Sequence, residues 1–346
     1  MAVLRVRGPA LPDGEVLDLW ADGDRWTTEP VPGAELIEGW LLPGLVDAHT
    51  HPGAEQIGDP LDDRILRDDL HRTVDSGVTF IRSPGLAGEP PDWFGQDPDV
   101  PRAVHAGPWI AQFGQFFDGW GRRAGHAELP ELAAAQAART GWAKIIADWR
   151  AGDEPVPLDV LCRIVERVHA VGGRVAVHSQ KPFGGTNAVR AGVDSIEHGE
   201  GLDPALLADM AAHGIAFTPT LSVLLSSVDA IRARADSPAR RATLTARLAH
   251  PGLTAAAAEA GVTLLAGTDT RPMGGIATEV RAMVAAGVPA HTALGAASWT
   301  ARAYLGLPGL EPGAPADAVV YRADPRTGLA ELDHPQAVVI RGVRVR

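Results

Sequence analysis

Short apolar runs that alternate with helical patterns are the feature that most constrains the fold of this chain. Between residues 41 and 307, runs short enough for one strand are followed by longer segments with apolar residues at helical spacing. This alternation is typical of repeated βα units around a parallel sheet. Eight runs are strand candidates, the number that a closed (β/α)8 TIM barrel requires. The candidate strands are 45–48, 78–82, 102–105, 143–146, 175–177, 195–197, 216–218 and 263–266, and the candidate helices include 62–75, 129–139, 158–170, 204–213 and 276–285.

The two ends of the chain follow a different pattern. Residues 3–40 hold short alternating apolar segments broken by Gly, Pro and Asp, and similar segments return at 317–321 and 337–345. Such segments indicate small strands joined by turns. Two further stretches lie outside the βα alternation: residues 107–125 are rich in Trp, Phe, Gln and Gly, and residues 222–248 carry many arginines. In a barrel these would be the third and seventh βα loops, at the mouth of the active site.

Two histidines follow the first apolar run of the central region. His49 and His51 are separated by one residue, so the period-two geometry of a strand places both imidazoles on the same side. If residues 45–48 form a buried strand, both side chains emerge at its carboxyl end, where parallel α/β folds carry their chemistry. Two imidazoles at this place suit a transition metal.

Four further residues of metal-ligand type lie in or directly after other apolar runs. They are Lys144, His178, His198 and Asp269. The motifs PGLVDAHTH, AKII, VAVH, IEHG and GTD together resemble the amidohydrolase superfamily of metal hydrolases, and most closely its imidazolonepropionase-like and prolidase-like branch. The resemblance covers nearly the whole chain. It implies an α/β fold in which residues 1–40 and 308–346 pair into one small β-domain beside a (β/α)8 barrel over residues 41–307.

Lys144 is the most informative of these residues. The chain has only two lysines, Lys144 and Lys181, among its 31 basic Lys and Arg residues. A lysine inside an apolar run therefore needs a specific reason, because a buried lysine can lose its proton and act as a nucleophile, whereas arginine stays protonated. In relatives with this pattern the lysine reacts with carbon dioxide, so the resemblance implies a carbamate on Lys144 that bridges two metals. The alternative is a lysine that extends from the strand end to solvent.

The resemblance also implies the role of each ligand. His49, His51 and Asp269 would bind the first of two divalent metal ions, His178 and His198 would bind the second, and carbamylated Lys144 would bridge them. Zinc is the leading choice, although imidazole and carboxylate ligands also suit manganese, iron or cobalt. A hydroxide held between the metals would attack the substrate, and Asp269 would carry its proton to the leaving amine. Asp269 could instead cap the segment that follows.

The resemblance does not extend to the substrate pocket. Prolidase-like relatives carry Arg-Asp after the second strand, Gly-Gly-His-Gly in the third loop and a second histidine after the ligand of strand five. This chain has RSPG at 82–85, QFGQFF at 112–117 and HSQK at 178–181. The pocket residues therefore have to be inferred from this sequence alone.

Four residues are candidates for contacts with a small-molecule substrate. Lys181 and Arg271 each lie close in sequence to a ligand-type residue at the predicted mouth, so they could clamp a free carboxylate of the substrate. An exposed loop lysine is otherwise simply solvated. His105 ends the third strand and Gln112 lies in the third loop, so either can reach a substrate there, as can His126 just after this loop.

Composition excludes several other classes of function. The net charge is −12 and the basic residues are scattered, which argues against a nucleic-acid partner. No apolar run reaches the roughly 18 residues of a membrane span, so no membrane association and a cytoplasmic location are expected. The single cysteine, Cys162, cannot form an internal disulfide and falls in an apolar helical pattern, which predicts a core position. The sequence leaves open whether the protein is a homo-oligomer.

The sequence therefore predicts a binuclear metal hydrolase that cleaves a C–N bond in an amide, peptide, cyclic imide or carbamate. One alternative is a mononuclear aminohydrolase, either a deaminase or an enzyme that opens an imidazolone-type ring, although such enzymes usually lack the lysine of strand four. Another is a lactonase or esterase, because the same nucleophile attacks esters. A catalytically inactive barrel that acts as a binding protein is disfavoured, because every expected ligand position is filled.

Overall fold

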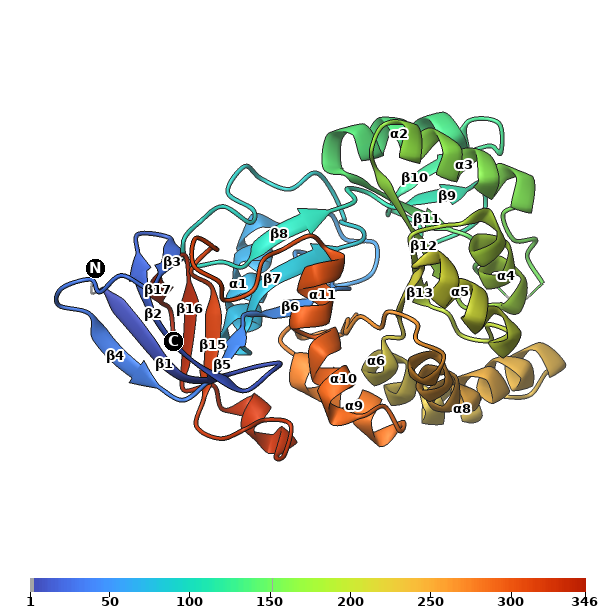
Figure 1. Cartoon of the computed structure of the whole chain (residues 1–346). Helices are drawn as coiled ribbons and strands as arrows, with labels where there is room; N and C mark the ends of the chain where they lie inside the picture. Colours follow the sequence, from blue (N-terminus) through green and yellow to red (C-terminus); the bar gives the residue numbers. More distant parts are fainter. Residues whose placement is uncertain (1–2, 151) are drawn as a thin grey trace.

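Parallel strands in the middle of the chain form two sheets in this computed structural model, which describes residues 3–150 and 152–346 (Figure 1). The smaller sheet has the order β6-β7-β8 and the larger one the order β10-β9-β11-β12-β13-β14. The strands are β6 (Leu45–Asp47), β7 (Val78–Ser83), β8 (Arg102–His105), β9 (Ile110–Gln112), β10 (Arg122–Ala124), β11 (Trp142–Ile146), β12 (Arg174–Ser179), β13 (Ser195–His198) and β14 (Ala216–Thr218). Seven of the eight predicted strands are therefore present, each within a few residues of its predicted bounds.

The eighth predicted strand, residues 263–266, forms only an isolated bridge between Leu264 and Phe217. Its backbone nevertheless joins the two sheets on one side, because Leu265 N donates to Phe217 O at 2.9 Å and Ala48 N donates to Ala266 O at 2.8 Å. Within residues 3–150 and 152–346, no strand pairing joins β8 to the larger sheet. The fold is thus mixed α/β, and closure into a complete barrel stays a prediction.

Helices connect the strands and supply apolar faces that cover the sheets. Asp62 caps the first one, because its side chain accepts a hydrogen bond from Ile65 N. The helices are α1 (Asp63–Asp75), α2 (Leu129–Thr140), α3 (Leu158–Ala170), α4 (Pro182–Ala191), α5 (Leu207–His213), α6 (Leu221–Ser226), α7 (Val228–Arg232), α8 (Pro238–Glu259), α9 (Ile276–Ala285), α10 (Ala290–Ala296) and α11 (Trp299–Tyr304), with 3-10 turns η1 (Pro204–Leu206) and η2 (Leu329–Asp333). No helix in the described part of the chain has both the length and the apolar character that crossing a membrane requires.

The prediction that Cys162 lies in the core is wrong. Helix α3 buries Val160, Leu161, Ile164, Val165 and Val168 against the rest of the protein. Cys162 falls on the other side of the same helix and is exposed. The apolar residues around it in sequence misled the prediction, because a turn of 3.6 residues separates neighbours by about 100°.

Both ends of the chain contribute to one eight-stranded sheet, seen on the left of Figure 1. Its order is β17-β16-β15-β5-β1-β2-β3, with β4 paired to β1. The strands are β1 (Leu4–Ala10), β2 (Glu15–Asp22), β3 (Arg25–Thr27), β4 (Glu35–Glu38), β5 (Trp40–Pro43), β15 (Ala318–Tyr321), β16 (Ala337–Ile340) and β17 (Val343–Arg344). The antiparallel pair of β5 and β15 joins the two ends. Because β5 continues through Gly44 into β6, this sheet anchors the strand that leads to His49 and His51.

Candidate metal centre

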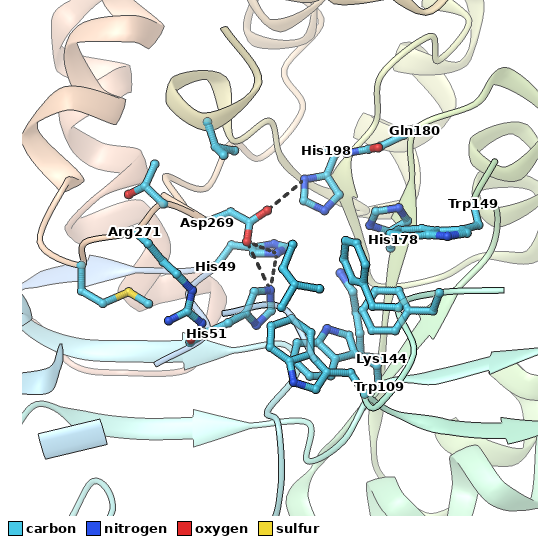
Figure 2. A pocket seen from close by; sticks show the side chains of 17 residues that line it. His49, His51, Trp109, Lys144, Trp149, His178, Gln180, His198, Asp269 and Arg271 are labelled. Atoms are coloured by element: carbon cyan, nitrogen blue, oxygen red, sulfur yellow. Dashed lines mark hydrogen bonds and ion pairs between the residues drawn. The ribbon is translucent and has the colours of Figure 1, made fainter. Parts of the chain in front are cut away.

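Five predicted ligands lie close together at the carboxyl ends of the parallel strands (Figure 2). His49 and His51 follow β6, and their Nε2 atoms are 3.1 Å apart. Asp269 follows residues 263–266, with its Oδ1 atom 3.5 Å from His51 Nε2. One ligand atom from each of these three residues lies within 4.8 Å of the others. His178 and His198 stand beside this group with ring centroids 4.6 Å apart, and Asp269 Oδ2 is 3.9 Å from His198 Nδ1.

Three of the histidines are held through their second ring nitrogen. His49 Nδ1 donates to Glu197 Oε2 at 2.5 Å, and His51 Nδ1 donates to Gly85 O at 2.6 Å. His198 Nδ1 lies 2.9 Å from Thr220 Oγ1. Such partners orient imidazoles and leave Nε2 free for a metal, as is usual around metal-bound histidines.

Glu197 links His49 to a buried arginine. Arg82 Nη2 donates to both carboxylate oxygens of Glu197, at 2.8 and 2.9 Å, and Arg82 Nε donates to Ala48 O at 2.7 Å. The side chains of Arg82 and Glu197 are 1% and 0% exposed. Although burial opposes the shift, the charges of Arg82 and Lys144 hold the pKa of Glu197 well below its usual value. The carboxylate is therefore ionised and accepts the proton of His49 Nδ1.

Lys144 and His178 present buried nitrogens to the same space. Among the described residues, neither Lys144 Nζ nor His178 Nε2 has a hydrogen-bond partner. Burial lowers the pKa of Lys144 to about 7, with the carboxylate of Glu197 opposing the shift and the charge of Arg82 adding to it. Buried polar atoms without partners are costly, so a ligand that occupies them is favoured. The donor set of imidazole, amine and carboxylate fits divalent metal ions.

The protonation states agree with a metal site. Burial lowers the pKa of His49 to about 4 and the pKa of His51, His178 and His198 well below the usual value, so the imidazoles are neutral, as metal ligands must be. Burial also raises the pKa of Asp269 to about 7, although its side chain remains 28% exposed. A carboxylate with this pKa can both accept and release a proton near neutral pH.

The backbone around these ligands is held in uncommon conformations. His198, Thr220 and Asp269 have φ angles of 65°, 48° and 50°, in the left-handed region that residues other than glycine seldom adopt. Such conformations cluster at functional sites. Gly267 allows a close approach, because a Cβ atom there would lie 2.4 Å from His49 Cβ and 2.8 Å from His49 N.

A pocket of about 380 Å³ opens above the ligands. Both loops predicted to shape the mouth contribute to it, residues 107–125 through four aromatic side chains and residues 222–248 through Val223. The aromatic residues are Trp109, Phe116, Phe117 and Trp120, joined by Trp149 after β11. The sequence pattern marked this loop as rich in Trp and Phe but distinguished none of these residues individually.

The predicted metal ligands all line the pocket, but only one of the four predicted substrate residues does so. Arg271 lines the pocket, but its Nη2 atom donates to His51 O at 2.6 Å and its Nη1 atom donates to Ala54 O. Lys181, His105 and Gln112 are not among the residues that line the pocket. Of the two residues of the predicted carboxylate clamp, the pocket therefore has Arg271 in its lining but not Lys181.

Local contacts account for the positions of the remaining candidates. His105 Nδ1 accepts a hydrogen bond from Gly107 N at 3.1 Å. Gln112 donates to Glu154 O at 2.7 Å, and its Oε1 atom lies 2.5 Å from His126 Nε2. Gln180, beside Lys181, lines the pocket and was missed. Its sequence position two residues after His178 was the available signal, because alternate strand residues point to the same side.

Comparisons with known proteins show what the chain is similar to. A family described as Amidohydrolase family matches residues 40–345. The uncharacterized protein Rv2915c of Mycobacterium tuberculosis (strain ATCC 25618 / H37Rv) is 40% identical over 359 residues, which cover 98% of this chain and 95% of that protein. Among solved structures, a Xaa-Pro dipeptidase with bound methionine aligns with a TM-score of 0.83 and 22% identity over 99% of each chain. Ochratoxinase of A. niger aligns with a TM-score of 0.80 and 20% identity over 100% of this chain and 96% of its own.

Proposed function

Because the chain belongs to the amidohydrolase family, we propose that it is a metal-dependent hydrolase of carbon–nitrogen bonds in small molecules. The target bond would belong to an amide, peptide, cyclic imide or carbamate. The observation that carries the proposal is the pair of buried, unpartnered nitrogens of Lys144 and His178, which line the same pocket as the cluster of His49, His51 and Asp269. The likeness of the fold to a dipeptidase supports this class of bond.

The finer proposal is a binuclear site, most simply one of zinc. The neighbouring side chains offer more donors than the four that one tetrahedral ion accepts. In the proposed arrangement His49, His51 and Asp269 would hold one ion, His178 and His198 would hold the other, and a carbamate on Lys144 would be a ligand of both. The short separations within the first group and between the two histidines of the second group support this division.

A carbamate would explain why, among the residues that the structure describes, the side chain of Lys144 is buried without a hydrogen-bond partner. Its neutral Nζ would form a bond to the carbon of CO2 and release one proton, which leaves an anionic group with two oxygen ligands. An ammonium ion in the same place would be 1% exposed, without an acceptor and repelled by two divalent cations. The buried nitrogen is therefore better suited to carry a ligand group than a charge.

Bound divalent ions would lower the pKa of a water molecule and polarise the substrate carbonyl. We call the six predicted ligands the ligand cluster: His49, His51, Lys144, His178, His198 and Asp269. Asp269 faces the pocket, where it can take a proton from the attacking water and deliver it to the leaving nitrogen. Glu197 and Gly85 O orient His49 and His51 throughout.

Closure of the barrel belongs to the same proposal. Two hydrogen bonds support it, from Leu265 N to Phe217 O and from Ala48 N to Ala266 O, because the eighth strand of a barrel would lie between β14 and β6. Such a barrel presents the carboxyl ends of all its strands to one pocket. A crystal structure would test this arrangement.

Metal content tests the binuclear site. The wild-type protein, loaded with zinc in the presence of bicarbonate, should contain about two ions per chain by elemental analysis. Lys144→Met should hold about one ion or none, because the bridging ligand is lost. Lys181→Met is the matched control, since it removes the only other lysine, and it should retain the wild-type content. With ¹³C-bicarbonate, a carbamate signal in the NMR spectrum should appear in the wild type and be missing only in Lys144→Met.

One ion at full occupancy beside an unmodified Lys144 would instead favour a mononuclear aminohydrolase. The compact group of His49, His51 and Asp269 is the observation that supports this second candidate. A hydrolysis screen of N-acyl amino acids, dipeptides, cyclic imides and lactones then separates C–N from C–O cleavage. Turnover of lactones alone would overturn the proposed C–N specificity.

A further inference from the structure

The pocket has one wall built almost entirely of aromatic rings. We call Trp109, Phe116, Phe117, Trp120 and Trp149 the aromatic wall. Trp109 stacks on Trp120 with ring centroids 4.9 Å apart and an interplanar angle of 15°, and Trp149 meets Phe117 edge to face at 4.6 Å. The wall reaches the ligand cluster at both ends. The ring centroid of Trp109 lies 5.0 Å from that of His51, and the ring centroid of Trp149 lies 5.6 Å from that of His178.

Glycine at one position permits this arrangement. A Cβ atom on residue 85 would lie 2.2 Å from Trp109 Nε1, so the indole can pack here only because residue 85 is glycine. Gly85 also accepts the hydrogen bond of His51 Nδ1. The same short segment thus positions both a candidate metal ligand and the start of the aromatic wall.

The rest of the pocket outside the ligand cluster is also largely apolar. Ile57, Val223 and Met273 line it together with Gln180, Thr270 and Arg271. Ile57, one of these lining residues, is 60% exposed. With a volume of about 380 Å³, the pocket lies near the lower end of the roughly 300–1,000 Å³ typical of ligand sites.

We infer that the substrate carries an uncharged aromatic ring, or a similarly flat apolar group, next to the bond that is cleaved. The carbonyl end would face the ligand cluster, and the ring would pack on the aromatic wall. The identity of the cleaved bond rests on the proposed function, whereas the preference for a ring rests on the wall itself. The small volume favours one ring over an extended aromatic system.

A carboxylate on this part of the substrate fits less well. Among the described lining residues outside the ligand cluster, Arg271 is the only cationic side chain, and it already donates to the carbonyl oxygens of His51 and Ala54. An anion placed against the aromatic wall would lose its hydration without gaining a cationic partner from the wall itself.

A cationic group also fits less well, although aromatic faces attract cations. The faces of Trp109 are occupied by its packing with Trp120, His51 and Phe116. Arg271 and any bound divalent ions would add repulsion. At Trp109, neighbouring rings therefore compete with a cation for the ring faces.

Ketones that cannot be hydrolysed test the inference independently of turnover. Binding of four probes to the zinc-loaded protein would be measured by calorimetry: acetophenone, cyclohexyl methyl ketone, 4-acetylbenzoate and (4-acetylphenyl)trimethylammonium. We expect acetophenone to bind about two- to ten-fold more tightly than cyclohexyl methyl ketone, which is the range that an aromatic contact adds beyond area. Both charged probes should bind more weakly than acetophenone.

Substitution of Trp149 tests whether the aromatic wall causes the preference for acetophenone. This side chain is half-buried, so Trp149→Leu keeps an apolar surface with little cost to the fold, and the preference for acetophenone over the cyclohexyl ketone should largely disappear. Trp20→Leu is the control, because Trp20 is also half-buried but lies in β2 of the end sheet. It should leave the preference unchanged.

Tighter binding of either charged probe, absence of binding by acetophenone, or an unchanged preference in Trp149→Leu would each overturn the inference. Hydrolysis of acetanilide and N-cyclohexylacetamide separates it from the proposed function. Turnover of both amides without an aromatic preference would retain the hydrolase and reject the aromatic site. The expected ketone series without turnover of any amide would retain the aromatic site and reject the hydrolase.

Discussion

Removal of the charge on Glu197 should weaken both the fold and the metal site, by different mechanisms. Glu197 is fully buried, accepts two hydrogen bonds from Arg82 and accepts the Nδ1 proton of His49. Glu197→Gln keeps the shape of the side chain. It leaves Arg82 buried without a counter-charge, and it replaces the anionic acceptor of His49 with a neutral amide.

The two effects have separate magnitudes. Loss of one partner of a buried ion pair costs about 3–5 kcal/mol of unfolding free energy, because the other charge remains buried. Loss of the group that orients a metal-binding histidine weakens metal binding about 10–100-fold. In the double variant Arg82→Met/Glu197→Gln no unpaired charge remains, so part of the stability should return. Zinc affinity should stay low, because His49 still lacks its carboxylate.

Urea denaturation of the metal-free protein measures the first effect, and competition with a chelator measures the second. Glu200→Gln is the matched control: Glu200 is 0% exposed and pairs at 2.7 Å with Arg247, which is 7% exposed. It should lose stability as Glu197→Gln does, yet retain wild-type zinc affinity.

If Glu197→Gln lowers the free energy of unfolding by less than about 1 kcal/mol, a value more typical of an exposed pair, then the buried pair of Arg82 and Glu197 does not have the role assigned to it. If Glu200→Gln weakens zinc binding as much as Glu197→Gln, the effect on zinc binding follows from general destabilisation rather than from His49.

Three further predictions follow from single residues. Asp269→Asn should keep the fold and some metal but lose roughly 10²–10⁴-fold in kcat, because an amide cannot accept the proton, and near-normal turnover would remove Asp269 from the mechanism. Gly267→Ala should lose about 1–3 kcal/mol in urea denaturation through its clash with His49, whereas Gly252→Ala, with open space around it, should gain about 0.5–1 kcal/mol. Burial raises the pKa of Glu279 to about 7, while the unfolded chain ionises this group near pH 4.3. Wild-type stability should therefore fall by about 3 kcal/mol relative to Glu279→Gln as the pH rises from about 4 to 7, and parallel pH profiles would contradict this.

Local periodicity in the sequence by itself determined many of the strands and helices. Seven predicted strands and the helices at 62–75, 129–139 and 158–170 match the observed elements closely, because the apolar spacing of a strand or helix is contained in a few consecutive residues. The spacing of His49 and His51 likewise placed both on one side of a chain that leaves a strand. The regular pairing expected of the eighth strand did not follow from its own residues, since a bridge requires partners supplied by β14 and β6.

Only the tertiary structure decided which side chains meet across the sheets. Glu197 lies 148 residues from His49, and its role depends on the register that brings β13 beside β12 and aims its side chain inward. A charged residue within the apolar run before His198 was the one signal of this role in the sequence. The hydrogen bonds from Arg271 to backbone carbonyls were equally hidden, and so was the choice of individual aromatic residues of loop 107–125 that line the pocket. Contacts between distant segments are set by packing and register, which no short window of sequence contains.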